Sequence, residues 1–112
     1  MQTQFDLKSL EAERLSLARP YFEFLRVPAM SAGIYLLPAG GTDKQKPHGQ
    51  DEIYYVIRGR AGLTIQDGTG QRILSVKAGD VIFVEALREH RFHSIEEELL
   101  LLVFFAPAES EA

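Results

Sequence analysis

Short apolar runs, separated by glycine, proline and aspartate, dominate the chain from Tyr21 onward. The runs are rich in β-branched, aromatic and aliphatic residues, which favour strands, and the residues between them favour turns. About eight runs predict strands, at 21–27, 32–37, 53–58, 62–67, 72–76, 80–84, 91–95 and 99–106. This pattern is typical of an all-β sandwich or barrel.

The connections between these runs carry further information. The segment DGTGQ, residues 67–71, holds two glycines that adopt positive φ at little cost, so residues 62–76 are predicted to form a hairpin. The acidic segment EEE, residues 96–98, is predicted to be a solvated turn.

The uncharged run LLLLVFF, residues 99–105, indicates a strand that is covered on both faces. In a barrel, one face of such a strand points inward. The other face needs a second cover, such as a packed sheet or another subunit. The run therefore favours a homodimer.

The first twenty residues have a different pattern, and we treat residues 1–20 as an N-terminal arm. The segment SLEAERLSLA begins with Ser9, which is suited to cap a helix, and it predicts one or two helical turns. An additional N-terminal strand is the alternative. The arm has acidic residues and no long apolar stretch, so we expect neither a secretory signal nor a membrane span, and we expect a cytoplasmic protein.

The composition indicates a single domain and excludes some partners and metal ligands. The chain has 112 residues, 46% of them hydrophobic and 25% charged, which fits one globular domain. Its net charge of -4 and the lack of a basic cluster exclude nucleic acid as an expected partner. Because there is no cysteine, any metal must be bound by nitrogen and oxygen ligands.

The middle of the chain resembles the cupins, a family of small β-barrels with two sequence blocks. The first block is G(X)5HXH(X)3,4E(X)6G. Gly40 begins it in this chain, His48 and Glu52 take the places of the second histidine and the glutamate, and Gly59 closes it. Lys46 stands where the block has its first histidine.

The second block, G(X)5PXG(X)2H(X)3N, follows at the expected distance. Gly79 begins it and His90 takes the place of its histidine. Glu85, Leu87 and Ser94 replace its proline, glycine and asparagine. The two blocks, in this order in so short a chain, resemble those of single-domain bacterial cupins.

This resemblance implies a cupin-type double-stranded β-helix, a jelly-roll-like barrel over residues 21–112, with the short arm before it. Cupins include dioxygenases, isomerases, decarboxylases and non-catalytic binders, so the resemblance leaves open whether this chain is an enzyme. It suggests dioxygenase or isomerase chemistry on a small organic molecule bound at the barrel mouth.

The candidate metal ligands are His48, Glu52 and His90. In a strand, alternate residues share a face, so His48 and Glu52 would lie on one face if the strand extends back that far. If that face and the face carrying His90 both turn inward, they bring two imidazoles and a carboxylate together. Such a set suits a divalent iron, manganese, nickel or zinc ion.

Four further residues are candidates for the pocket. Lys46 cannot coordinate a metal while its amine is protonated. If its side chain points inward, its charge would repel a cation or bind an anionic group. If it points outward, it would be solvated. Gln50 can offer an oxygen or bind a water molecule, while Tyr54 and Phe92 suit a partly apolar ligand. His93 is expected on the opposite face from His90, at the surface.

An alternative interpretation needs no metal. The polar side chains would then hydrogen-bond to one another around water, in a barrel that binds or senses a small molecule without catalysis.

Overall fold

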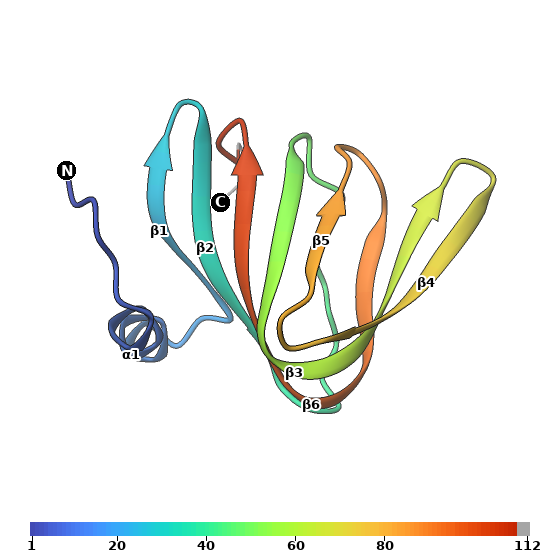
Figure 1. Ribbon diagram of the computed structural model, residues 1–112, viewed down its shortest axis with the longest axis horizontal. Coiled ribbons are helices and arrows are strands. Elements are labelled where there is room, and N and C mark those ends of the chain that lie inside the picture. The colour runs from blue at the N-terminus through green and yellow to red at the C-terminus, as the bar shows by residue number, and fades with distance from the viewer. Residues whose placement is uncertain (110–112) are drawn as a thin grey trace.

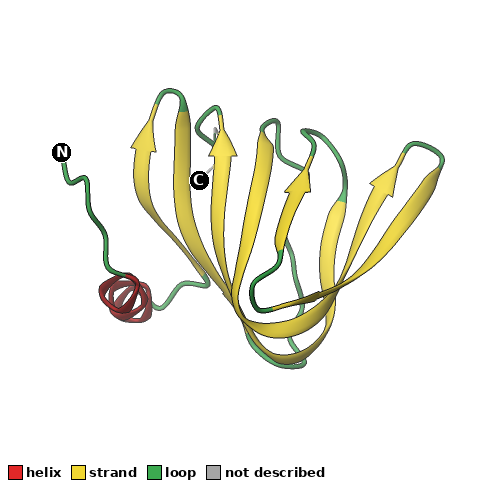
Figure 2. Ribbon diagram, in the orientation of Figure 1, coloured by secondary structure: helices red, strands yellow, loops and turns green. Residues whose placement is uncertain are grey.

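The computed structural model describes residues 1–109, and within them one helix precedes six strands (Figures 1 and 2). The elements are α1 (Leu7–Leu17), β1 (Tyr21–Val27), β2 (Met30–Leu37), β3 (Asp51–Asp67), β4 (Gly70–Lys77), β5 (Val81–Val84) and β6 (His90–Ala106). The all-β prediction is confirmed.

The strands form one antiparallel sheet that curls into a cup. Its order is β1-β2-β6-β3-β4, and β5 pairs with β3 beside this path. Figure 1 shows that the long strands β3 and β6 bend at the base of the molecule, so that their two halves lie on different sides of the cup. The concave side holds the core.

Two pairs of predicted strands are single strands in the structure. The runs 53–58 and 62–67 both belong to β3, and the runs 91–95 and 99–106 both belong to β6. The two strands stay paired through the bend because register shifts between Val56 and Gly62 absorb the curvature. The prediction of two separate strands at each of these places was wrong.

The predicted turn at residues 96–98 is also wrong. These glutamates lie within β6, where Glu97 pairs with Arg60 of β3 in the ladder. Their side chains reach solvent and form ion pairs, with 2.8 Å from Glu97 to Arg60 and 2.9 Å from Glu98 to Arg58. The charged run therefore marks the outer side of a bent strand, not a reversal of the chain.

The hairpin predicted at residues 62–76 is confirmed. Strands β3 and β4 pair from Arg60 with Lys77 to Asp67 with Gly70. Gly68 has a φ of +67°, a conformation that costs glycine little.

The N-terminal arm contains a helix, and it is longer than the one or two turns predicted. Its cap is Asp6 and not Ser9, because the Asp6 carboxylate accepts the Ser9 backbone N–H at 3.2 Å and the Ser9 hydroxyl at 2.6 Å. The arm packs on the sheet: Leu10 is buried, and the rings of Phe5 and of Phe24 in β1 lie 4.9 Å apart.

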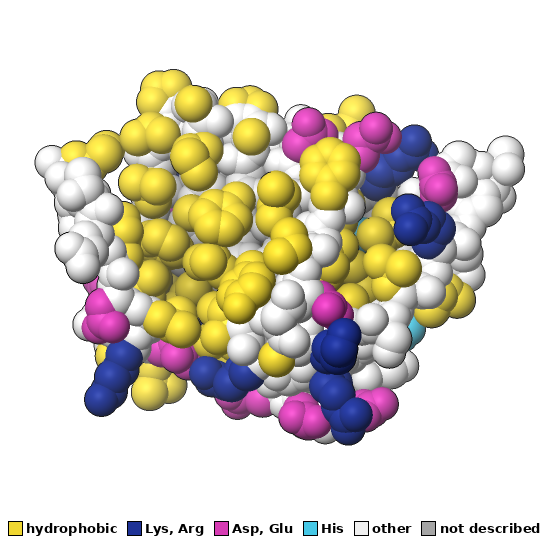
Figure 3. Space-filling view, viewed as in Figure 1, with side chains coloured by type: hydrophobic (Ala, Val, Ile, Leu, Met, Phe, Trp, Pro, Cys, Tyr) yellow, Lys and Arg dark blue, Asp and Glu magenta, His cyan; other side chains and the backbone are white. Residues whose placement is uncertain are grey.

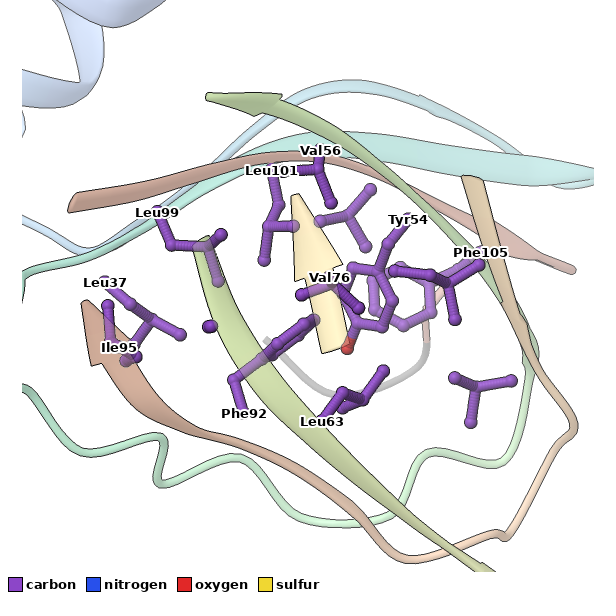
Figure 4. Close-up of a cluster of buried hydrophobic side chains, with 14 residues drawn as sticks. Leu37, Tyr54, Val56, Leu63, Val76, Phe92, Ile95, Leu99, Leu101 and Phe105 are labelled. Atoms are coloured by element: carbon purple, nitrogen blue, oxygen red, sulfur yellow. The ribbon is translucent and has the colours of Figure 1, made fainter. Parts of the chain in front are cut away.

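The core is a cluster of apolar side chains on the concave side of the sheet (Figure 4). From the run LLLLVFF, the alternate residues Leu99, Leu101, Val103 and Phe105 join this cluster. Leu100, on the other face, is also fully buried. The run is thus largely covered on both faces, as its lack of charge predicted.

No helix in residues 1–109 is long and apolar enough to cross a membrane.

Candidate functional site

A small cavity lies on the concave side of the sheet, between β2, β3, β6 and the loop that leads into β3. Its volume is about 150 Å³. Its lining combines aromatic, aliphatic, acidic and imidazole side chains: Tyr21, Tyr35, Gln45, His48, Glu52, Tyr54, Val103, Phe105 and Glu109.

A buried group of polar side chains in the site joins β3 to β6. His90 Nε2 lies 3.2 Å from Glu52 Oε1 and 3.0 Å from the Tyr54 hydroxyl. The Glu52 side chain is almost completely buried, and its second oxygen, Oε2, has no hydrogen-bond partner within the described residues. A buried carboxylate oxygen without a partner is costly unless a ligand, an ion or water satisfies it.

His48 reaches the site from a loop and not from a strand. We expected His48 and Glu52 to share a strand face if the strand extended back to His48. It does not, because β3 begins at Asp51. The loop is fixed where the His48 carbonyl accepts the Leu87 N–H at 2.8 Å, and the imidazole packs edge-on against Phe105 at 4.8 Å. Its Nδ1 donates to Glu109 Oε1 at 3.1 Å.

The three predicted metal ligands share one region, though they are not in contact as a set. The ring centres of His48 and His90 are 6.3 Å apart, and His90 contacts Glu52 directly. Within residues 1–109, no three histidine, aspartate or glutamate side chains are already arranged to hold a metal ion. The donor chemistry suits a divalent cation, and the unpartnered Glu52 oxygen offers a place for one.

Comparison with known proteins identifies the family. The family model described as "Cupin domain" matches residues 33–105. The chain belongs to the cupin family. It is 48% identical over 106 residues to the uncharacterized protein SCO3923 of Streptomyces coelicolor, covering 95% of this chain and 97% of that protein.

Solved structures agree with this assignment. TT1209 from Thermus thermophilus has a TM-score of 0.73 and 23% identity, covering 96% of this chain and 99% of that one. A single-residue variant of oxalate decarboxylase from Bacillus subtilis has a TM-score of 0.69 and 26% identity, covering 76% of this chain and 22% of that one. The cupin fold predicted from the two sequence blocks is thereby confirmed.

The four candidate pocket residues of this cupin have different locations. Lys46 is exposed and does not line the cavity. Gln50 is buried outside the cavity lining. Tyr54 lines the cavity, and Phe92 packs behind it in the core with ring centres 5.0 Å apart. His93 is on the other face of β6, as expected, and its Nε2 lies 2.8 Å from the Thr64 hydroxyl.

Sequence reasoning missed a group of residues that supports the site. Asp43 is fully buried, and its carboxylate accepts hydrogen bonds from the Tyr35 hydroxyl, the Gln45 amide and the Phe92 N–H, each at 2.9 Å. Gln45 in turn accepts from the Tyr54 hydroxyl at 3.1 Å. An aspartate in a segment rich in glycine and proline has the local pattern of a turn residue, so the pattern carried no signal of this role.

The two imidazoles have altered acidity. Burial lowers the pKa of His90, but the hydrogen bonds to Glu52 and to the Arg88 carbonyl outweigh burial, and the pKa is raised. The hydrogen bond to Glu109 raises the pKa of His48. Burial and the nearby Glu52 carboxylate raise the pKa of the Tyr54 hydroxyl, so this hydroxyl stays protonated at neutral pH.

These shifts predict the pH dependence of stability. A histidine pKa that is higher in the folded than in the unfolded protein stabilises the fold below the unfolded value of about 6.5, and this contribution disappears as pH rises through the folded pKa. The metal-free cupin is therefore expected to lose free energy of unfolding as pH rises from about 6.5 through the two raised pKa values. Urea denaturation with a chelator present measures it.

A His48→Gln variant isolates the contribution of His48, because it keeps a polar side chain without a titrating imidazole. It is expected to show a smaller decrease than the wild type over the same pH range. An equal or larger decrease in the variant would contradict the assignment.

Proposed function

We propose that this cupin binds a small organic molecule in its cavity, together with one divalent metal ion held by His48, Glu52 and His90. The observation that carries the proposal is the buried Glu52 oxygen that lacks a partner, within the described residues, beside an imidazole. A carboxylate and two neutral imidazoles are a ligand set of metal-dependent oxygenases and related enzymes.

The ion would be iron, manganese, nickel or zinc, since the same ligands suit all four. Such an ion would supply Lewis acidity, or oxygen activation if it is iron. The family suggests dioxygenase or isomerase chemistry. The likeness to oxalate decarboxylase supports a small organic substrate, without identifying it.

The cavity itself supports a compact, partly apolar ligand. A volume of about 150 Å³ suits a molecule near the size of benzene. Val103 and Phe105 offer apolar contact. The Tyr21 hydroxyl is buried and has no partner within the described residues, so it is available to hydrogen-bond to a ligand.

A specific observation favours a second candidate, a metal-free binding or sensing cupin. No three potential ligands in residues 1–109 are arranged for a metal, and Lys46 replaces a histidine of the first cupin block. In that case His90 and His48 would keep their carboxylate partners, and the cavity would bind its ligand without catalysis.

Elemental analysis separates these candidates. Protein purified without chelators or added metals is expected to contain about one metal ion per chain, and His48→Ala is expected to lose it. His93→Ala is the matched control, because His93 is not a proposed ligand and its Nε2 already lies 2.8 Å from the Thr64 hydroxyl. Folded wild-type protein that contains no metal, and takes up none on reconstitution, would favour the metal-free cupin.

We also propose that the cupin is a homodimer. Ile53 and Tyr55 of β3 lie directly opposite Phe83 and Val81 of β5, and all four side chains are exposed on the outer face of the sheet. Hydrophobic side chains gather over the left and centre of the face seen in Figure 3. An exposed apolar patch on a sheet favours association with a second copy.

Light scattering coupled to size-exclusion chromatography measures the oligomeric state and tests the dimer. Phe83→Glu is expected to convert the dimer to a monomer, because it places a charge in the patch. Ile73→Glu on β4, an equally exposed apolar position outside the patch, is expected to leave the dimer intact. A wild-type monomer at micromolar concentration would overturn the proposal.

A further inference from the structure

We propose that Glu109, in the segment that follows β6, is a positioning residue of the site. Its carboxylate accepts the Nδ1 proton of His48, so that in the neutral imidazole Nε2 is the nitrogen without a proton. This inference rests on the proposed function for its purpose, since an unprotonated nitrogen is what a metal ion or a hydrogen-bond donor of a ligand requires.

Glu109 is held in place by its own backbone and by that of its neighbour. Its N–H donates to the Ser31 hydroxyl of β2 at 2.9 Å, and its carbonyl accepts from the Arg26 guanidinium of β1. The preceding residue, Ala108, donates its N–H to the Pro28 carbonyl at 3.4 Å. The segment is thus attached to the first two strands, and the Glu109 side chain lines the cavity.

The direction of the hydrogen bond follows from the chemistry of the two groups. An ionised carboxylate can only accept, so the proton between Glu109 Oε1 and His48 Nδ1, 3.1 Å apart, belongs to the imidazole. A neutral imidazole carries one proton. With Nδ1 protonated, Nε2 of His48 has a free lone pair.

The second imidazole of the site has an acceptor at each nitrogen, a backbone carbonyl at Nδ1 and Glu52 Oε1 at 3.2 Å from Nε2, so its tautomer is not fixed in the way proposed for His48. His90 Nδ1 lies 2.9 Å from the backbone carbonyl of Arg88, which can only accept. His90 is the first residue of β6, and the backbone carbonyl two residues before it can accept the Nδ1 proton. His48 lies in a loop, and its Nδ1 partner comes from a distant segment, through Glu109.

A carboxylate also affects the imidazole more strongly than a carbonyl does. A charged acceptor makes a stronger hydrogen bond and increases the basicity of the opposite nitrogen. Glu109 would therefore raise the affinity of His48 Nε2 for a metal ion. Loss of such an outer carboxylate commonly weakens metal binding by about 10- to 100-fold.

The test compares Glu109→Ala and Glu109→Gln in the full chain. Long-range ¹⁵N–¹H spectra of the metal-free protein, recorded at a pH where a titration shows the imidazoles to be neutral, report the tautomer of each histidine. We expect the Nδ1–H tautomer for His48 in the wild type and its loss in Glu109→Ala. The Gln variant keeps an acceptor oxygen and is expected to restore much of the Nδ1–H population, with His90 unchanged throughout.

Metal affinity is the second readout, measured by competition of zinc between the protein and a chelator. Glu109→Ala is expected to bind about 10- to 100-fold more weakly than the wild type, and Glu109→Gln is expected to lie between them. Glu98→Ala, which removes an exposed carboxylate paired with Arg58, is the control and is expected to match the wild type.

The two readouts distinguish this inference from the proposed function. If the His48 tautomer responds to Glu109→Ala but no form binds zinc, the positioning role stands and the metal proposal fails. If zinc binds and neither the tautomer nor the affinity changes in Glu109→Ala, the inference is overturned while the metal proposal stands.

Discussion

His90→Ala is expected to lower the free energy of unfolding by about 3 kcal/mol and to abolish metal binding. The cause is Glu52, whose side chain is almost completely buried and whose Oε1 is paired with His90. Removing one partner of a buried pair leaves the other charge without compensation. Urea denaturation of the metal-free variant and wild type under the same conditions measures the change.

A second substitution tests that cause. In His90→Ala, the additional change Glu52→Gln removes the uncompensated charge, so the double variant is expected to be more stable than the single one. His93→Ala is the control: this histidine binds the Thr64 hydroxyl, and its loss is expected to cost about 1 kcal/mol. Equal stability of His90→Ala and the wild type would mean that Glu52 carries no buried charge.

Gly59→Ala is expected to destabilise the protein by about 3 kcal/mol or more. Gly59 lies where β3 bends against β6 and has a φ of +101°, which side chains rarely tolerate. An added Cβ would also meet the Glu98 carbonyl oxygen and lie 2.8 Å from the Leu99 Cα. These are backbone atoms of the neighbouring strand, so they cannot move aside cheaply.

Gly70→Ala is the matched control, because Gly70 also lies in a strand and a Cβ there would meet nothing within 4 Å. Its expected effect is within about 0.5 kcal/mol. Chemical denaturation of both variants measures the difference. Similar stability of the two would show that the sheet can bend at residue 59 without glycine.

Gly59 illustrates how far the sequence could predict this fold. Its place at the end of the first cupin block marked it as important, and the structure supplies the reason, a close approach of two backbones at a bend. The same bend explains why β3 and β6 were each predicted as two strands and why residues 96–98 were predicted as a turn. Polar and glycine residues at 59–62 and 96–98 have the local pattern of turns, although β3 and β6 pair through both segments.

The candidate site was predictable only in part. The spacing of the blocks selected His48, Glu52 and His90, and the structure brings His90 into contact with Glu52. Strand alternation was the wrong basis for His48, which a loop carries to the cavity. No pattern in the sequence indicated Glu109, because its partner His48 lies far away along the chain.

Local residue patterns were thus enough to establish the all-β class, the β3–β4 hairpin and the largely buried strand at residues 99–105. Alternation of side chains and the backbone freedom of glycine act between neighbouring residues, so the amino-acid order alone reveals them. The bent β3–β6 pair, the Asp43 hydrogen bonds and the His48–Glu109 contact came from the tertiary structure alone. These contacts join segments that are far apart in the sequence. Whether such segments meet depends on how the whole sheet curls, and the local periodicity of the sequence does not determine that curvature.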